Sequence, residues 1–349
     1  MTQPIYQIEN LKHSYLPNHT VLEIDSLSIQ QASITGLMGP NGSGKTTLLK
    51  LMAFIHEPSR GIILFKGRPA EPFSEHVRFR ATLLTQDAYL MKRSVYANIA
   101  YGLKIRGDKN NLKSKISRAL SMVGLEYDSF AKRQWDELSG GEAQRVAMAA
   151  RLVLKPEVLL LDEPTARVDA ASIALIRDAA LKAREEWGAT LIIAGHDREW
   201  LYDVCDNMLH MFRGRILGES SENIIFGPWE KKENGTWEKH LQDKQKIVVN
   251  NLPEKNAAAV IDSSAFSIYP SDHGADQKTD RTPNMLHGTI ARLMLEKDGT
   301  GIIAVIRVGS MAFNVKLSIE DMRAADLYPG RDVRLSFDPA SVKWIGSNS

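Results

Sequence analysis

A glycine-rich loop constrains this chain more than any other feature of its sequence. Residues 39–46 read Gly-Pro-Asn-Gly-Ser-Gly-Lys-Thr, a complete G-x-x-x-x-G-K-[ST] pattern. The loop follows an apolar run at 34–38 and precedes an apolar helical pattern that begins at Leu48. Glycines let successive backbone N–H groups point at phosphate oxygens, and the following helix adds its positive end. The pattern therefore predicts a strand, a phosphate-binding loop and a helix, with Lys45 on the β- and γ-phosphates and Thr46 on Mg²⁺.

The bulk properties fit a globular protein of about two domains. The chain has 349 residues, 43% apolar and 25% charged, and a net charge of only +2, so no overall basic field points to nucleic acid. No apolar run reaches the roughly 18 residues that span a bilayer, and the first ten residues lack a signal-peptide core. The single cysteine, Cys205, excludes internal disulfides and fits a reducing compartment. We expect a cytoplasmic protein that works at a membrane only by docking on other subunits.

The first part of the chain, residues 1–218, has an α/β pattern. Apolar runs at 34–38, 158–161 and 190–194 predict buried parallel strands. Each run ends in a polar or glycine-rich cluster, and ligand sites in open α/β sheets lie at the carboxyl ends of strands. We therefore expect the three clusters to meet at one site. Helical spacing of apolar residues predicts helices over 112–123, 140–154 and 170–186.

The pattern changes after residue 218. Short alternating stretches are broken by turn residues such as Tyr328-Pro329-Gly330, and residues 302–306 and 312–315 read as strands. The pattern over residues 219–349 therefore predicts a small all-β barrel domain.

Two further motifs extend the argument. The run at 158–161 ends in Asp162-Glu163-Pro164, and residues 138–142, Leu-Ser-Gly-Gly-Glu, open a predicted helix. Together with Gln86 and His196, this order resembles the ATP-binding-cassette (ABC) ATPases over roughly residues 5–215, and the L-S-G-G-E signature is diagnostic of that family among P-loop ATPases. The resemblance implies an α/β P-loop ATPase domain at 1–218, with a helical subdomain at about 87–135.

The resemblance implies roles for the matching residues. Glu163 would be the general base, His196 would contact the γ-phosphate and orient water, and Gln86 would contact Mg²⁺ or water and link to the transmembrane partner. The metal-binding set is Thr46, Gln86 and Asp162, the last through water. Tyr15 would stack on adenine. The implied nucleotide-binding set is Tyr15, Gly39, Pro40, Asn41, Gly42, Ser43, Gly44, Lys45, Thr46, Thr47, Ser139, Gly140, Gly141 and Asp169.

The signature residues form a second anion site. Ser139, Gly140 and Gly141 offer a hydroxyl and backbone N–H groups at the start of a helix. One chain does not need two phosphate cradles for one nucleotide. The resemblance implies that the signature of one copy closes over ATP bound to the other, as a homodimer with two sandwiched ATP molecules.

Two segments depart from the commonest family form. Residues 164–169 read P-T-A-R-V-D where the common form is P-T-S-A-L-D, and this variant resembles importers of tungstate-type oxyanions. Residues 194–197 read A-G-H-D instead of ending in T-H-D. Neither change removes a catalytic group, since Asp169 and His196 are kept.

A β domain after a single cassette resembles importer ATPases for sugars, polyamines, ferric iron, and molybdate or tungstate. Residues 37–44 and 94–103 look most like the oxyanion and iron group. We expect the ATP-hydrolysing subunit of an ABC importer for tungstate or molybdate, with ferric iron, sugar or polyamine as alternatives. The implied partners are transmembrane permease subunits and, indirectly, a periplasmic or extracellular solute-binding protein, which places the chain peripherally on the cytoplasmic face of the membrane.

The role of the second domain stays open. Residues 288–315 resemble the oxyanion-binding module of molybdate ATPases, but its S-A-R-N segment is replaced by Arg281-Thr282-Pro283-Asn284, which keeps only the Asn. A structural or dimerising barrel is an equal interpretation, and no basic-aromatic stripe points to nucleic acid.

An alternative from another class is a soluble ABC ATPase acting on ribosomes or DNA, though such proteins usually carry two cassettes or a long coiled-coil insertion. A stand-alone oxyanion sensor is disfavoured by the complete hydrolytic set.

Overall fold

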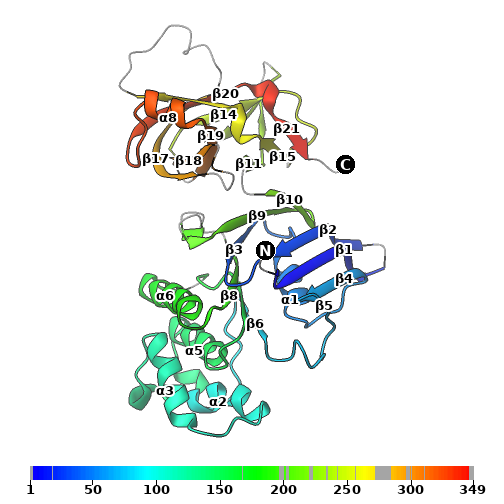
Figure 1. Cartoon of the computed structure of the whole chain (residues 1–349), viewed down its shortest axis with the longest axis vertical. Coiled ribbons are helices and arrows are strands. Elements are labelled where there is room, and N and C mark those ends of the chain that lie inside the picture. Colours follow the sequence, from blue (N-terminus) through cyan, green and yellow to red (C-terminus); the bar gives the residue numbers. More distant parts are fainter. Residues whose placement is uncertain are drawn as a thin grey trace. The chain divides into compact units, whose positions relative to one another are not determined.

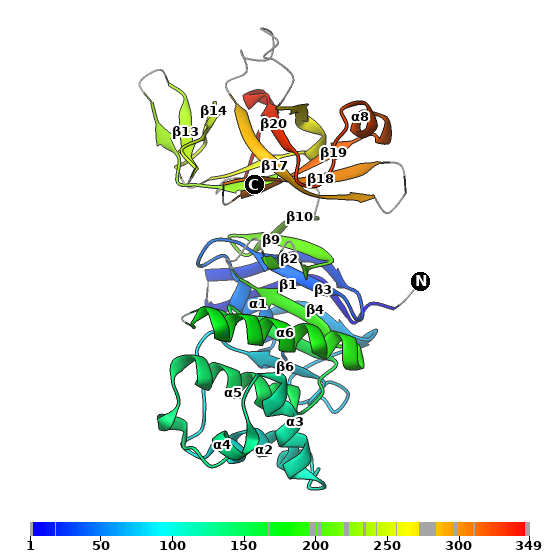
Figure 2. The ribbon, with the colours of Figure 1, turned by 90° about the vertical axis from the view of Figure 1, so that its left-hand side faces the viewer.

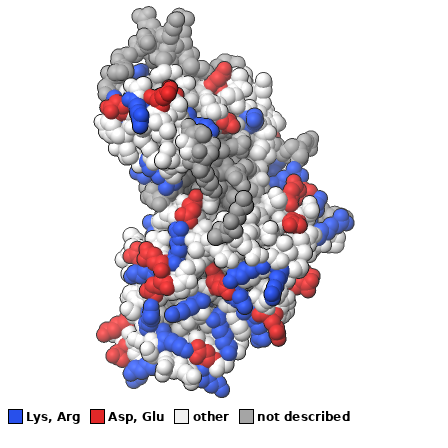
Figure 3. Space-filling model, in the orientation of Figure 1, with Lys and Arg blue, Asp and Glu red and all other residues white. Residues whose placement is uncertain are grey.

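The structure is a computed structural model that divides into two compact units, Met1–Leu217 and Gly218–Ser349. The described residues are 3–17, 19–166, 168–195, 200–201, 204–219, 223–232, 235–241, 243–255, 257–271, 284–295, 299, 301–309 and 311–345. Within these ranges, none of the helices combines the length and the apolar character that a membrane span requires. On the face drawn in Figure 3, basic side chains lie among acidic ones.

A six-stranded sheet forms the centre of the first unit (Figure 1). Its order is β10-β9-β3-β8-β7-β6; β3 pairs in parallel with β8 and β9, and β7 pairs in parallel with β8 and β6. The parallel strands predicted at 34–38, 158–161 and 190–194 are confirmed, and every residue of these three strands is buried. The bounds are β3 Ile34–Met38, β6 Ala81–Leu84, β7 Val158–Asp162, β8 Thr190–Ala194, β9 Asn207–Phe212 and β10 Arg215–Glu219.

A four-stranded sheet in the order β2-β1-β4-β5 completes the strands of this unit. Its long hairpin pairs β1 with β2 antiparallel, and β1 also pairs antiparallel with β4. The bounds are β1 Tyr6–Leu16, β2 His19–Ile29, β4 Arg60–Phe65 and β5 Arg68–Pro69.

The helices of the first unit agree with the predicted periodicity. The helices predicted over 112–123, 140–154 and 170–186 are present as α3, α5 and α6. Gly124 follows α3 with a φ of 68°, a left-handed conformation that ends the helix and that glycine adopts without strain. The bounds are α1 Lys45–Met52, α2 Val95–Ile105, α3 Leu112–Met122, α4 Tyr127–Phe130, η1 Trp135–Glu137, α5 Gly140–Leu152 and α6 Ala170–Trp187.

The six-stranded sheet is buried on both faces because alternate residues of its strands enter two different cores. In β7, Leu159 and Leu161 belong to a core shared with α2, α3, α5 and α6. Val158 and Leu160 belong to a second core shared with α1 and the antiparallel sheet. Helices α2, α3 and α5 accordingly lie at one end of the unit, and β1, β2 and β4 lie at the other (Figure 1, Figure 2). Helices α1 and α5 therefore pack against opposite faces of the sheet.

The second unit is built mainly from strands, in sheets of order β11-β15-β21, β12-β13-β14 and β16-β20-β17-β18-β19 (Figure 2). The strands predicted at 302–306 and 312–315 are present as β18 and β19. The edges of the largest sheet meet in the core, since the rings of Phe266 on β16 and Phe313 on β19 have centroids 5.7 Å apart. The bounds are β11 Asn223–Phe226, β12 Glu230–Lys231, β13 Trp237–His240, β14 Lys246–Val249, β15 Ala258–Ile261, η2 Ser263–Ala265, β16 Phe266–Pro270, β17 Met285–Leu295, β18 Ile302–Val308, β19 Met311–Leu317, α8 Ile319–Ala324, β20 Asp332–Phe337, η4 Pro339–Ser341 and β21 Lys343–Ile345.

Asn284, the one residue kept from the S-A-R-N pattern, has a structural task in this unit. The residue is fully buried. Its Oδ1 accepts a hydrogen bond from the Val248 amide at 2.6 Å, and its Nδ2 donates to the Val248 carbonyl at 2.8 Å. The side-chain amide therefore pairs with a residue of β14 as a neighbouring strand would. Residues 281–283 of the same segment lie outside the described residues.

Candidate functional site

The predicted site residues follow four neighbouring strands. Because β3, β8, β7 and β6 are consecutive in the sheet and run parallel, their carboxyl ends meet at one edge. The phosphate loop, residues 39–46, follows β3, Asp162 and Glu163 lie at the end of β7, and Gln86 comes two residues after β6. His196 follows Gly195 at the end of β8 in the sequence, but it lies outside the described residues.

The phosphate loop is closed by its own lysine. Lys45, at the start of α1, donates from Nζ to the Gly39 carbonyl at 2.9 Å and to the Pro40 carbonyl at 3.2 Å. Burial lowers the pKa of Lys45, and the carboxylates of Glu163 and Asp162 oppose that shift. The ammonium group is thus held inside the loop, and the two carboxylates favour its charged form.

The loop has the features of an anion site. The Ser43 hydroxyl is buried and has no hydrogen-bond partner among the described residues, so it is available to a ligand oxygen. Gly44 has a φ of 103°, and a Cβ there would lie 2.5 Å from Leu22 Cδ2, so only glycine fits. Space around the Gly42 Cα is open. These features fit a triphosphate cradled by backbone N–H groups at the start of a helix.

The two carboxylates differ in environment. Asp162 is buried, and burial raises its pKa; a hydrogen bond from the Thr46 hydroxyl opposes the rise, and the Glu163 charge adds to it. Glu163 is only partly buried. Mg²⁺ in such sites is bound by one or two carboxylates together with phosphates and water. Asp162 and Thr46 therefore fit a Mg²⁺ that neutralises the charge of Asp162.

The backbone of Glu163 is held in a conformation unusual for its type. Its φ is 47°, in the left-handed region, which costs a non-glycine residue on the order of 1–3 kcal/mol. The Glu163 amide donates to the Ala194 carbonyl of β8 at 2.9 Å, and the Glu163 carbonyl accepts from the Ala166 amide at 3.0 Å. These bonds fix the backbone from which the Glu163 side chain extends, just beyond the strand end.

Two buried polar residues that the sequence analysis missed support the segment around Gln86. Gln144 of α5 is buried and donates from Nε2 to the Thr85 carbonyl at 3.2 Å. Asn98 of α2 accepts from the Met91 amide at 2.8 Å and donates to the Met91, Arg93 and Ser94 carbonyls at 3.1 Å. The segment between β6 and α2 is therefore fixed by side chains of two helices. The only sequence signal was a polar residue within an otherwise apolar helical stripe.

The signature loop, residues 138–142, begins α5 with a capping box. The Ser139 hydroxyl accepts from the Glu142 amide at 3.3 Å, and the Ser139 amide donates to Glu142 Oε2 at 2.8 Å. The hydrogen bonds from Ser139 lower the pKa of Glu142. Ser139 and Gly140 are exposed.

Gly141 and Asp169 bring the signature loop against α6. The Asp169 carboxylate caps α6 by accepting from the Ser172 amide at 2.9 Å and the Ser172 hydroxyl at 2.8 Å. A Cβ at Gly141 would lie 2.5 Å from both Asp169 Oδ2 and Ser172 Oγ. Asp169, predicted as a nucleotide-binding residue, therefore has a structural task within its own chain.

Tyr15, near the tip of the β1–β2 hairpin, lies beside the phosphate-loop helix. Its hydroxyl donates to the Thr47 hydroxyl oxygen at 3.3 Å, and the side chain is 50% exposed. Half of the side-chain surface therefore remains accessible beside the start of α1.

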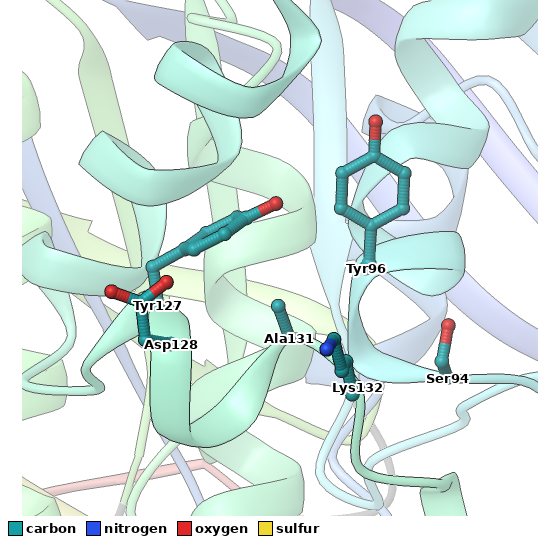
Figure 4. A pocket seen from close by; sticks show the side chains of 6 residues that line it. All are labelled: Ser94, Tyr96, Tyr127, Asp128, Ala131 and Lys132. Carbon is teal, nitrogen blue, oxygen red and sulfur yellow. The ribbon is translucent and has the colours of Figure 1, made fainter.

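A pocket of about 490 Å³ lies apart from these strand ends, in the helical subdomain. Tyr96 near the start of α2 and Tyr127 at the start of α4 lie on opposite sides of Ala131 (Figure 4). The remaining lining residues are Ser94, Asp128 and Lys132.

Known proteins with similar sequences include ATP-binding proteins of uptake and import systems. A family model described as "ABC transporter" matches residues 22–166. The tungstate uptake system ATP-binding protein TupC of Peptoclostridium acidaminophilum is 40% identical over 210 residues, 60% of this chain and 95% of that protein. The spermidine/putrescine import ATP-binding protein PotA of Mesoplasma florum is 30% identical over 280 residues, 80% of this chain and 78% of that protein. The Fe(3+) ions import ATP-binding protein FbpC of Escherichia coli O157:H7 is 36% identical over 210 residues, 60% of each chain.

Two solved structures share the fold. One is cbiO1 from Clostridium perfringens, part of the ABC transporter complex cbiONQ, with a TM-score of 0.56 at 30% sequence identity. The match covers 62% of this chain and 88% of the cbiO1 chain. The other is the ATP-binding cassette MJ0796, in a dimeric post-hydrolysis state with ADP and Pi, with a TM-score of 0.56 at 23% sequence identity. The match covers 62% of this chain and 97% of the MJ0796 chain.

The fold and the site define a P-loop ATPase with the ABC signature. The chain belongs to the ATP-binding subunits of ABC transporters, of the importer type, and it is an ATPase that converts ATP and water to ADP and phosphate.

The packing of the signature loop predicts different effects for its two glycines. Gly141→Ala places a Cβ against the Asp169–Ser172 cap, so we expect a loss of about 1–3 kcal/mol in the free energy of unfolding. Gly140→Ala is the matched control, because nothing lies within 4 Å of its Cβ, and it should be neutral or slightly stabilising. Urea unfolding of both variants measures this. Equal stability of the two variants would contradict the close packing at Gly141.

Proposed function

We propose that the chain binds ATP and Mg²⁺ at the ends of β3, β7 and β6 and that hydrolysis drives uptake of tungstate or molybdate. The observation that carries the ATP site is the placement of the phosphate loop and the Asp162–Glu163 pair on strands separated only by β8. The loop carries the donors and β7 carries the carboxylates, which are the two halves of a phosphoryl-transfer site.

In this mechanism the loop and Lys45 bind the phosphates and offset the charge that develops on them. Thr46, and Asp162 through water, would hold Mg²⁺, and Gln86 would contact the metal or the attacking water; the metal would supply charge neutralisation at the phosphate oxygens. Glu163 accepts the proton from the attacking water as the water oxygen bonds to the γ-phosphorus. The bond from that phosphorus to the bridging oxygen then breaks, and ADP leaves. His196 orients the water and contacts the γ-phosphate.

We propose that the working form is a homodimer with two ATP molecules between the copies. Helices α1 and α5 pack on opposite faces of the sheet, in different cores, and the Ser139 hydroxyl and the Gly140 N–H belong to exposed residues at the start of α5. An anion of a second copy would satisfy these donors. The signature loop then closes the nucleotide site of its partner.

We propose that permease subunits bind the helical subdomain and hold the chain peripherally at the cytoplasmic face of the membrane. Large apolar side chains remain exposed there: Tyr89 is 73% exposed, Ile105 45% and Tyr101 43%. Tyr89 lies three residues after Gln86 in the sequence. A partner that contacts Tyr89 would therefore bind next to the segment that carries Gln86. A solute-binding protein would join the assembly through the permease.

The choice of tungstate or molybdate rests on the match to TupC, which spans 210 residues, about the length of the first unit. The match to PotA spans 280 residues and so extends beyond the 217 of the first unit. A polyamine importer is therefore the second candidate, favoured by the similarity that includes part of the second unit. A ferric iron importer is a further alternative, supported by a match of 210 residues to FbpC.

We propose that the second unit is an OB-like barrel, an accessory domain at 219–349, without oxyanion feedback. Asn284 is fully buried, and both polar atoms of its amide bond to the Val248 backbone, so the one residue kept from the oxyanion pattern serves packing and is not exposed to a dianion. Calorimetric titration of the full chain with tungstate should accordingly give no micromolar isotherm. Such an isotherm, lost in a variant truncated after residue 218, would make the second unit a sensor.

Glu163→Gln tests the general base. The change keeps the shape and removes the basic carboxylate, so ATP turnover should fall by roughly 10²-fold or more while ATP still binds. Lys45→Ala is the contrasting variant, since it removes charged hydrogen bonds to the phosphates and should weaken ATP binding by about ten- to a hundredfold. Steady-state phosphate release and equilibrium ATP binding separate the two. Near-normal turnover in Glu163→Gln would identify a different base.

Uptake by cells lacking the chain tests the solute. High-affinity uptake of tungstate or molybdate should be lost and should return with the wild-type chain but not with Lys45→Ala. Unchanged uptake of both oxyanions, with loss of ferric iron or polyamine uptake, would replace the assignment by the corresponding alternative.

A further inference from the structure

Three aromatic rings from separate parts of the first unit meet beside the phosphate loop. The rings of His13 and Tyr15 on β1 have centroids 4.8 Å apart at an interplanar angle of 88°. His56, in the segment between α1 and β4, lies 5.7 Å from Tyr15 at 86° and 6.1 Å from His13 at 19°. Tyr15 therefore has two perpendicular ring contacts, and the two imidazoles stack on each other.

His13 is an unusual choice for its position. The residue is 6% exposed, and neither ring nitrogen makes a hydrogen bond of good geometry with the described residues. Burial lowers the pKa of His13, a hydrogen-bonding contact with the Glu57 backbone opposes that shift, and the neighbouring His56 adds to it. Burying poorly paired polar atoms is unfavourable, and an aliphatic side chain would fill the volume without that cost. What an aliphatic side chain lacks is a flat ring, which is the part of His13 that contacts Tyr15.

Two hydrogen bonds tie this cluster to its surroundings. The Tyr15 hydroxyl bonds to Thr47 of α1, and the Ser14 amide donates to Ser59 Oγ at 3.1 Å. The hairpin is thus joined both to the phosphate-loop helix and to the segment that carries His56. The rings and these bonds together restrict both ends of the Tyr15 side chain while half of its surface stays exposed.

We propose that His13 and His56 are positioning residues that hold the Tyr15 ring in place as a platform for the nucleobase of ATP. This inference rests on the proposed role of Tyr15 in binding adenine. Edge-to-face ring contacts fix the plane of Tyr15 before the nucleotide arrives, so less side-chain freedom is lost on binding. The effect acts on the base and leaves the phosphates untouched.

A comparison of ATP with inorganic tripolyphosphate, which lacks the base, tests the proposal. The variants are His56→Ala, His13→Leu and Tyr15→Ala, with each histidine change also combined with Tyr15→Ala. His287→Ala, an exposed histidine of the second unit, is the matched control, and Tyr15→Phe keeps the ring but removes the bond to Thr47. Isothermal titration measures the affinity of both probes, and steady-state hydrolysis measures kcat and KM.

We expect each histidine variant to weaken ATP binding by roughly three- to tenfold and to leave tripolyphosphate binding unchanged. KM for ATP should rise with kcat unchanged, as for an interaction equal in ground and transition states. In the Tyr15→Ala background the histidine changes should add nothing, because they act through that ring. His56 is only partly buried, so His56→Ala keeps the test valid if His13→Leu does not fold.

Other outcomes overturn the inference in distinguishable ways. If Tyr15→Ala weakens ATP binding and the histidine variants do not, the platform stands and its positioning by histidines is wrong. If the histidine variants weaken ATP and tripolyphosphate equally, their role is structural. If Tyr15→Ala itself leaves ATP affinity unchanged, the proposed base site is wrong and the inference falls with it.

Discussion

The parallel pairing of β3, β8, β7 and β6 is the constraint on which the rest of the first unit depends. Parallel strands bring their carboxyl ends to one edge, and a sheet buried on both faces favours polar groups at its strand ends. The phosphate loop and the carboxylate pair therefore meet although more than a hundred residues separate them in the chain. Their spacing is set by strand pairing, and the Glu163 amide bonded to the Ala194 carbonyl extends that pairing by one residue.

The same edge explains why the site combines burial with charge. Lys45 and Asp162 are both buried, and burial shifts the pKa of each toward its neutral form. Their mutual attraction and the Thr46 hydroxyl oppose those shifts. An anion bound beside Lys45 and a cation bound beside Asp162 would each offset the cost of burying the neighbouring charge.

The features that could be predicted from the sequence are those determined by interactions between residues close together in the chain. The three buried strands, helices α3, α5 and α6, and the phosphate loop each depend on residues within a short window. The supporting bonds depend on partners far along the chain: Gln144 reaches Thr85, and Asn284 reaches Val248. Nothing near His13 in the sequence indicates that its ring meets His56. Such partners become known only when the fold brings the elements together, and Asn284 shows how a residue kept from a binding pattern can serve packing instead.

In the proposed dimer, the signature loop of one copy closes the nucleotide site of the other. The signature loop begins α5, whereas the phosphate loop begins α1 on the other face of the sheet, so we infer that each site needs a second copy. Analytical ultracentrifugation of Glu163→Gln with Mg²⁺ and either ATP or ADP tests this directly. The account predicts ATP-dependent association into a dimer that ADP does not produce, and loss of that association when Ser139→Arg is added, with one ATP still bound per monomer. Association of the double variant on ATP to the same extent as Glu163→Gln alone would contradict it.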